Sequence, residues 1–398
     1  MRESVAGFTS TGSKRPEALF GGPADGLPSA MVRSAGYRVW DAEGREYLDL
    51  IMALGAVALG YGHPVVTEAA VRAVRDGVVG PLPPVLEEEL AAELARRIPW
   101  VEQTRFLKTG AEAMAAAVRL ARAVTGRETV LGCGYHGWLD WCQGRTIVGV
   151  PAGTRALYAE LSFNDPERTR ERIRRAGDTL AAVVFEPVIL APPDPEWLAV
   201  LREETTRAGA LLIADEIKTV GRLAPWGGCE RFGIRPDLVV MAKAIANGFP
   251  LAAVGGRAEV MRAVRRTWIS STLATEWVSL AAAHATLGVM AAENVPAHLA
   301  RVGARLLAGF HNLAERYPRV VREVAGLPEM CCLQFHDEAA GAALAVAAAR
   351  RGLLFKRSAY NFVSLAHDDA AIDRALVILG EGLEEVGAVG EGPSLRSG

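Results

Sequence analysis

The chain has 398 residues, half of them apolar, and carries 44 basic and 46 acidic residues for a formal net charge of −2. This length suits two domains with a large core, and the balanced charge gives no reason to expect nucleic acid or an anionic membrane as a partner. The longest apolar stretch falls well short of the roughly 20 residues of a membrane-spanning helix. Because the five cysteines form no C-x-x-C pair, we expect no structural metal or disulfide framework, and we expect a soluble cytoplasmic protein.

The N-terminal part of the chain predicts an arm followed by a hairpin. Residues 1–30 are rich in Gly, Pro and Ser, lack the apolar core of a signal peptide, and are expected to be poorly structured. Residues 37–50 alternate in polarity around Glu43-Gly44, a pattern that favours a β-hairpin. We assign residues 1–60 to an N-terminal arm and part of a small domain.

The middle of the chain predicts a large α/β domain over residues 61–285, because helical and strand-like segments alternate there. Residues 88–98 and 112–126 have the pattern of amphipathic helices, and Gly126 is expected to stop the second. The β-rich runs that follow are TVLG (129–132), AAVVFEP (181–187), ALLIADE (210–216), DLVVMAK (237–243) and LAAVGG (251–256).

The C-terminal part predicts a smaller α+β unit over residues 286–385. It contains an Ala/Arg-rich helix, a strand at MCCLQFH, a further helix and a strand at NFVSLAH. Residues 386–398 are expected to form a disordered tail. The predicted fold class is therefore α/β, with a large, mainly parallel-sheet domain and a small α+β domain.

Several of the predicted strands end in residues capable of chemistry. TRFLKTGAE, AVVFEPV, LLIADEI and LVVMAKA are the runs concerned. In open parallel sheets, ligands bind beyond the carboxyl ends of the strands. Four such ends at one edge therefore suggest a shared site.

Lys243 lies in an apolar run and is one of only five lysines. Burial of an ammonium is costly, so a lysine in this position commonly loses its proton or becomes covalently engaged. The alternative is that the long side chain lets the amine reach water.

Asp215 and Glu216 end the run LLIADE, and Asp215 lies 28 residues before Lys243. A buried carboxylate needs a cationic or hydrogen-bonding partner, so the two residues either form a structural ion pair or serve one cofactor. Pyridoxal phosphate requires a lysine, a carboxylate for the pyridine nitrogen, donors for the phosphate and an aromatic ring for stacking. Lys243, Asp215, Tyr135 and the small-residue turn 109–111 before a helix could fill these roles. The turn alone could equally be a helix cap formed by Thr109.

Residues 132–137, GCGYHG, match the G-x-G-x-x-G pattern of dinucleotide sites. That pattern should open a helix and precede an acidic residue about 20 positions on. The following segment is weakly helical and TIVGV ends without an acid. We therefore expect a glycine-rich turn and keep a nicotinamide-dependent oxidoreductase as a distant alternative.

Six segments together resemble the class III, fold-type I pyridoxal-phosphate aminotransferases, in particular their glutamate-1-semialdehyde 2,1-aminomutase-like branch. The segments are TGAEAMAAAVRLARAVTGRE, GYHGW, FEPV, ADEIKTVGR, MAKAIANGFPLAAVGG and FVSLAH. The resemblance runs from about residue 37 to about residue 385. It implies a cofactor-binding large domain, a small domain built from both terminal segments, and amino transfer from a small amine donor to a carbonyl acceptor.

The resemblance also implies the catalytic residues. Lys243 would form the Schiff base with pyridoxal phosphate and later move the proton. Asp215 would pair with the pyridinium nitrogen, and Glu186 would belong to the hydrogen-bond network on the hydroxyl side of the ring.

Five residues would bind the cofactor by the same resemblance. Tyr135 would stack on one face of the ring and Ile217 would pack behind the other. Gly110 and Ala111 would contact the phosphate. Thr272 would reach the phosphate of the neighbouring subunit, which implies a homodimer.

The sequence departs from the family pattern in three places. Residues 271–277 keep Thr272 but lose the Gly-Asn-Pro of the family's G-T-x-S-G-N-P segment, and Ala111 stands where the family usually has Ser or Thr. The N-terminal arginine that grips the substrate carboxylate in the aminomutase is not evident, because Glu17 or Ala18 occupies its position.

The missing arginine bears on the substrate. Arg15, Lys356 or Arg357 could replace it, or could be solvated surface charges. We therefore expect a neutral or sugar-like acceptor, with Trp138 and Trp141 as candidate pocket residues, and keep the aminomutase as an alternative. A non-catalytic relative that retains the fold for binding is a further possibility.

Overall fold

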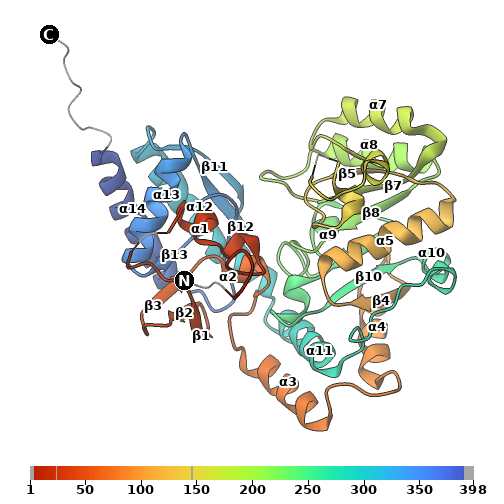
Figure 1. The fold of residues 1–398 in the computed structure, drawn as a ribbon, viewed down its shortest axis with the longest axis horizontal. Coiled ribbons are helices and arrows are strands. Elements are labelled where there is room, and N and C mark those ends of the chain that lie inside the picture. The colour runs from red at the N-terminus through yellow and green to blue at the C-terminus, as the bar shows by residue number, and fades with distance from the viewer. Residues whose placement is uncertain (1–3, 24, 145–146, 390–398) are drawn as a thin grey trace. The chain divides into compact units, whose positions relative to one another are not determined.

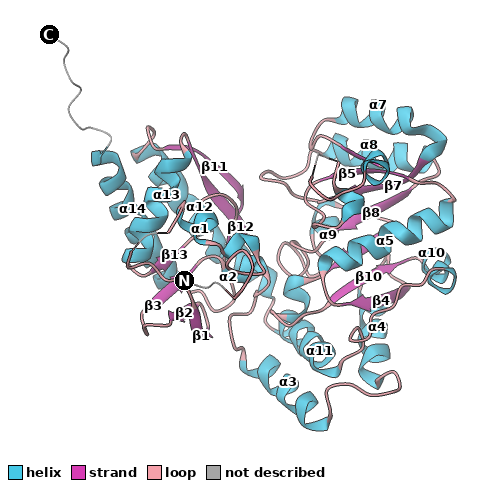
Figure 2. Ribbon diagram, in the orientation of Figure 1, coloured by secondary structure: helices cyan, strands magenta, loops and turns pink. Residues whose placement is uncertain are grey.

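The computed structural model of the protein describes residues 4–23, 25–144 and 147–389 (Figure 1). Helices and strands alternate along much of the chain (Figure 2), as the predicted α/β class requires. In the described residues, no helix is both long and apolar enough to cross a membrane.

The chain forms two compact units. One contains residues 64–296, and the other combines residues 1–63 with residues 297–398. The transitions therefore lie near Pro64 and Pro296. The domain boundaries drawn from the sequence at 60/61 and 285/286 remain predictions.

The unit of residues 64–296 is built on a seven-stranded sheet with the order β4-β10-β9-β8-β7-β5-β6. Strands β5 to β9 pair in parallel, whereas β10 is antiparallel to both β4 and β9. Strand β4 therefore runs in the same direction as β5 to β9, and their carboxyl ends meet at one edge. The strands are β4 (Gln103–Leu107), β5 (Thr129–Cys133), β6 (Tyr158–Glu160), β7 (Leu180–Phe185), β8 (Leu211–Asp215), β9 (Leu238–Met241) and β10 (Ala252–Gly256).

Both faces of this sheet are covered by helices, which explains why its central strands are continuous apolar runs. Alternate residues of a strand point to opposite faces. Val184 packs in a cluster with α5 (Gly110–Thr125), whereas Val183 and Phe185 pack in a cluster with α7 (Pro166–Ala176) and α8 (Pro195–Arg207).

Helix α5 has the ends that the sequence predicts. Thr109 and Glu112 form a capping box at its start, and Gly126 ends it in a left-handed conformation with φ 69°. The remaining helices of this unit are α3 (Pro64–Asp76), α4 (Val85–Arg97), α6 (Ala152–Ala156), α9 (Gly228–Phe232), α10 (Ala258–Met261) and α11 (Trp277–Ala292). Short 3₁₀ turns are η2 (Asp140–Cys142), η3 (Gly177–Thr179), η4 (Lys243–Ala246) and η5 (Arg262–Arg266).

The unit of both chain ends contains two small sheets, with the orders β1-β2-β3-β13 and β11-β12-β14. The predicted hairpin is confirmed, because β2 and β3 pair antiparallel around Gly44. The strands are β1 (Met31–Ala35), β2 (Arg38–Asp41), β3 (Glu46–Asp49), β11 (Val321–Leu327), β12 (Met330–Phe335), β13 (Leu353–Leu354) and β14 (Asn361–Phe362). The helices are η1 (Gly12–Lys14), α1 (Pro16–Phe20), α2 (Met52–Gly55), α12 (Val295–Arg316), α13 (Glu338–Arg350) and α14 (Asp369–Val389).

The described parts of the N-terminal arm and of the predicted tail are more ordered than the composition suggested. In the N-terminal arm, η1 and α1 form and Phe20 is buried. Lys356 is itself buried and donates to the carbonyl oxygens of Ser13 and Ala18, both at 3.2 Å, so it is not a solvated surface charge. Helix α14 continues through residues 386–389, and the rest of the predicted tail lies outside the described residues.

Candidate active site

The chemically capable residues meet at the carboxyl edge of the seven-stranded sheet. Lys243 follows β9, Asp215 ends β8, and Glu186 follows β7. Helix α5 begins just after β4, and Tyr135 lies in the loop after β5. The shared edge predicted from the four strand ends is therefore present.

Asp215 is a buried carboxylate with both oxygens engaged. Its Oδ2 accepts a hydrogen bond from Nδ1 of buried His136 at 2.8 Å, and its Oδ1 accepts from the backbone N–H of Ile217 at 3.2 Å. No ion pair joins Asp215 to Lys243 in the part of the chain that the structure describes. Of the two predicted arrangements, the structural ion pair is therefore wrong.

His136 is a site residue that the sequence analysis missed. It follows Tyr135 in the glycine-rich turn after β5. Because only β7 lies between β5 and β8, this turn is close to Asp215 at the end of β8. The signal was present, because a buried aspartate needs a donor and His136 is the polar residue of that turn. Its Nε2 has no hydrogen-bond partner among the described residues.

Lys243 combines an unusual backbone with a perturbed amine. It begins η4 with φ 52°, a left-handed conformation that non-glycine residues rarely adopt. Burial lowers the pKa of its amine to about 8, and the positive charge of Lys218 acts in the same direction. Asp215 and Glu186 oppose this shift. The amine therefore loses its proton far more readily than an exposed lysine, as a nucleophile requires.

Glu186 joins two loops on the β7 side of the site. Its Oε1 accepts from the backbone N–H of Tyr135 at 2.6 Å, and its Oε2 accepts from Nζ of Lys218. Lys218 is the second residue that the sequence analysis missed. The segment ADEIK already placed this scarce residue three positions after Asp215.

The start of α5 offers an anion site. Thr109 caps the helix as the alternative reading held, and its Oγ1 accepts from the backbone N–H of Glu112 at 3.2 Å. The N–H groups of Gly110 and Ala111 have no partner among the described residues, and they lie at the positive end of a 16-residue helix. Such a terminus suits a phosphate.

The neighbouring loops pack tightly on this turn. A Cβ added to Gly110 would lie 2.7 Å from Cδ1 of Ile217, and one added to Gly137 would lie 2.8 Å from Cβ of Ala111. The turns after β8 and β5 thus meet the turn after β4. Anion-binding N–H groups, a buried carboxylate and a low-pKa lysine together fit pyridoxal phosphate.

The aromatic candidates differ in exposure. Tyr135 and Trp138 are 74% and 75% exposed. Both help to line a hollow of about 260 Å³ in this unit. Trp141 is instead buried in the core, where the centroid of its ring lies 6.3 Å from that of His136.

Thr272 is exposed, and in the described chain it makes no hydrogen bond to another predicted site residue.

Arg357 belongs to the unit of both chain ends. Its guanidinium donates to the carbonyl oxygen of Glu17 at 2.9 Å. That bond ties it to α1, the segment where the aminomutase arginine was sought. Its predicted substrate role stays a prediction.

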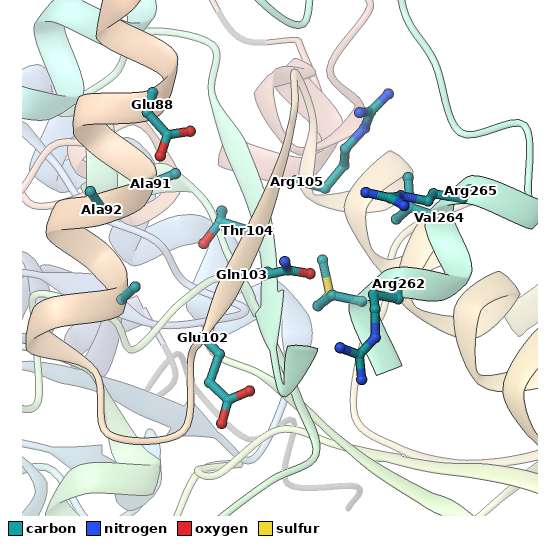
Figure 3. Close-up of a pocket in the computed structure, with 12 residues that line it drawn as sticks. Glu88, Ala91, Ala92, Glu102, Gln103, Thr104, Arg105, Arg262, Val264 and Arg265 are labelled. Carbon is teal, nitrogen blue, oxygen red and sulfur yellow. The ribbon is translucent and has the colours of Figure 1, made fainter. Parts of the chain in front are cut away.

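A cavity of about 490 Å³ lies away from all these residues, beside edge strand β4. Figure 3 shows Glu88 of α4 on one side of β4, and Arg262 and Arg265 of η5 on the other. None of the predicted site residues lines it.

The chain is similar to known proteins in both sequence and fold. Residues 22–381 match the class III aminotransferase family. A glutamate-1-semialdehyde 2,1-aminomutase of Thermus thermophilus is 37% identical over 327 residues, which is 76% of each chain. A transaminase solved with pyridoxal phosphate bound has a TM-score of 0.86 at 28% identity, covering 94% of this chain and 95% of that one. A β-phenylalanine aminotransferase of Variovorax paradoxus has a TM-score of 0.81 at 29% identity, covering 90% and 88%.

The chain belongs to the class III aminotransferase family. It is a fold-type I, pyridoxal-phosphate-dependent transaminase, as the resemblance implied. Residues 132–137 end β5 and enter a loop without opening a helix, so the dinucleotide-like pattern is a glycine-rich turn.

Proposed function

We propose that Lys243 is the residue that bonds the cofactor and moves the proton during amino transfer between a small amine donor and a carbonyl acceptor. The observation that carries this proposal is the placement of a low-pKa lysine at the same sheet edge as a buried, doubly hydrogen-bonded aspartate. When bound, pyridoxal phosphate supplies the electron sink for the carbanion chemistry.

The other residues orient the cofactor. Asp215, held by His136, keeps the pyridine nitrogen protonated. The N–H groups of Gly110 and Ala111 bind the phosphate, Tyr135 stacks on the ring and Ile217 packs behind it. Lys243 would then take the proton from the donor carbon and deliver it to the cofactor carbon, as a positioned general base and acid.

Replacement of the lysine tests the assignment. Lys243→Ala is expected to lower the rate of a single-turnover half-reaction by at least 10²- to 10⁴-fold, the usual contribution of a positioned proton-transfer group. Lys14→Ala, at an exposed lysine of the other unit, is the matched control and is expected to leave the rate unchanged. A Lys243→Ala protein with unimpaired turnover would end the proposal.

We further propose a homodimer in which Thr272 reaches the cofactor phosphate of the neighbouring subunit. The exposure of Thr272 in the single chain supports this arrangement. Mixed dimers of Lys243→Ala and Thr272→Ala subunits provide a sharp test. If Thr272 acts across the interface, one of the two sites in each mixed dimer is intact and activity returns on mixing. If it acts within its own subunit, no site is intact and mixing restores nothing.

For the acceptor we propose a neutral or sugar-like carbonyl compound. The support is that α1 carries Glu17 and Ala18 in the segment where the aminomutase arginine was sought, while neighbouring Arg357 binds a backbone carbonyl. The aminomutase is the second candidate, because its Thermus relative is 37% identical. Rapid conversion of glutamate-1-semialdehyde to 5-aminolevulinate without an added donor would establish that alternative.

We also propose a cytoplasmic location, which the five free cysteines support.

A further inference from the structure

Lys218 is a second lysine at the site, and the proposed function leaves it without a role. It lies in the turn after β8, three residues beyond Asp215, and its side chain is only 16% exposed. Its Nζ donates to Oε2 of Glu186, whose other oxygen accepts from the backbone N–H of Tyr135 at 2.6 Å. The carboxylate thus holds the ammonium between the loops after β5, β7 and β8.

The order of the strands shows which side of the cofactor this pair faces. In the order β4-β10-β9-β8-β7, the phosphate-binding start of α5 follows β4 and Glu186 follows β7, with Lys243 and Asp215 between them. On the pyridine ring, the carbon that bonds the lysine is flanked by the phosphate-bearing and the hydroxyl-bearing carbons. With the phosphate on the β4 side, the hydroxyl faces Glu186 and Lys218.

We propose that Lys218 holds a fixed positive charge beside the phenolic oxygen of the cofactor. This charge favours the unprotonated form of the nitrogen that joins Lys243 to the cofactor. A positive neighbour stabilises the phenolate and disfavours a second positive charge on the adjacent nitrogen. Glu186 acts through Lys218, as a positioning residue. This inference rests on the proposed function, because it requires Lys243 to carry the cofactor.

Several charged groups act on the Lys243 amine in addition to its burial. Asp215 at the end of β8 and Glu186 after β7 are negative, and Arg222 in the loop after β8 is positive. Of these neighbours, Lys218 has the largest effect on the pKa of the Lys243 amine, and it lowers that pKa. Buried Glu216 beside Asp215 is engaged by Thr219 and by the N–H groups of Gly228 and Cys229.

The test is a spectrophotometric pH titration of the holoenzyme, following the visible band of the lysine-bound cofactor. Lys218→Met is expected to raise the midpoint by on the order of one pH unit, as loss of a nearby like charge does. Lys218→Arg keeps the charge and is expected to stay near the wild-type midpoint. An unchanged midpoint in Lys218→Met would overturn the inference.

A double variant separates the lysine from its partner. Lys218→Met leaves Glu186 unpaired, and that negative charge alone would raise the midpoint. In Lys218→Met/Glu186→Gln both charges are gone, and a midpoint still above wild type is expected. A midpoint at or below wild type would assign the effect to Glu186 and overturn the role of Lys218. Lys218→Gln repeats the titration with a polar side chain if the Met variant does not fold.

The same titration distinguishes this inference from the proposed function. A wild-type protein that forms no visible band with added cofactor would refute the assignment of Lys243. A wild-type band that titrates normally, together with a Lys218→Met midpoint equal to it, would refute only the role of Lys218.

Discussion

Replacing Lys243 with methionine is expected to stabilise the cofactor-free protein at neutral pH. The change removes a charge that burial disfavours and keeps an unbranched side chain of similar length. The folded-state pKa is lowered from 10.5 to about 8. At about 1.4 kcal/mol per unit, the buried charge costs the folded state up to about 3 kcal/mol below pH 8.

The pH dependence of this difference follows from the direction of the shift. Below pH 8 both the folded and the unfolded chain bind the Lys243 proton, so the full penalty is present. Between pH 8 and 10.5 the unfolded chain binds more protons than the folded one, and the stability of the wild type therefore rises with pH. Lys243→Met lacks this group, so its advantage is expected to be largest at pH 7 and to disappear towards pH 10.5.

The assay is the melting temperature of both cofactor-free proteins from pH 6 to pH 10. A rise of a few degrees for Lys243→Met at pH 7 corresponds to the calculated penalty. Lys14→Met is the matched control, since Lys14 is exposed, and its melting temperature should follow the wild type throughout. A Lys243→Met protein that is less stable at pH 7, with a gap that does not depend on pH, would refute the lowered pKa of Lys243.

Three further predictions concern substitutions of single residues. His136→Phe removes the 2.8 Å donor to Asp215 and is expected to weaken cofactor binding roughly 10- to 100-fold in an equilibrium titration, whereas unchanged binding would contradict a role for His136. Glu276→Ala removes the cap of α11 and the partner of Lys108, 2.6 Å away, and should cost about 1 to 2 kcal/mol in urea unfolding. Burial raises the pKa of Glu276, but hydrogen bonds from Lys108 and Ser279 outweigh burial and hold this pKa below 4.5. The loss of stability should therefore shrink as the pH falls through the lowered pKa, and a loss that does not depend on pH would contradict the ion pair. Lys356→Met removes both bonds to the N-terminal segment, and faster tryptic cleavage after Lys14 is expected, whereas an unchanged rate would show that other contacts hold the segment.

The sheet and its catalytic edge were predictable because they depend on local pattern. Apolar strands ending in Asp215 and before Lys243 mark both the parallel sheet and the site, and Thr109 and Gly126 mark the ends of α5. The formation of ordered structure in the N-terminal arm was not predictable from its composition. It depends on Lys356, which is more than 330 residues away along the chain.

His136 and Lys218 escaped the sequence analysis for a related reason. Each has its partner on a different strand connection, so its role appears only when the strand order is known. His136 follows β5 and binds Asp215 at the end of β8, while Lys218 follows β8 and binds Glu186 after β7. Both bonds cross the sheet edge between segments 30 or more residues apart.

The pairing of the charges explains which of the two lysines can act as the nucleophile. Lys218 has a carboxylate partner in Glu186. Asp215 and Glu186 are already engaged by His136, Lys218 and backbone N–H groups, and no carboxylate in the described chain pairs with Lys243. Burial and the positive charge of Lys218 therefore outweigh the opposing effects of Asp215 and Glu186, and the pKa of the Lys243 amine falls to about 8. The two lysines have the same side chain, so the position of the Glu186 carboxylate is what distinguishes their roles. Exchanging these roles would require this carboxylate to pair with Lys243 instead of Lys218.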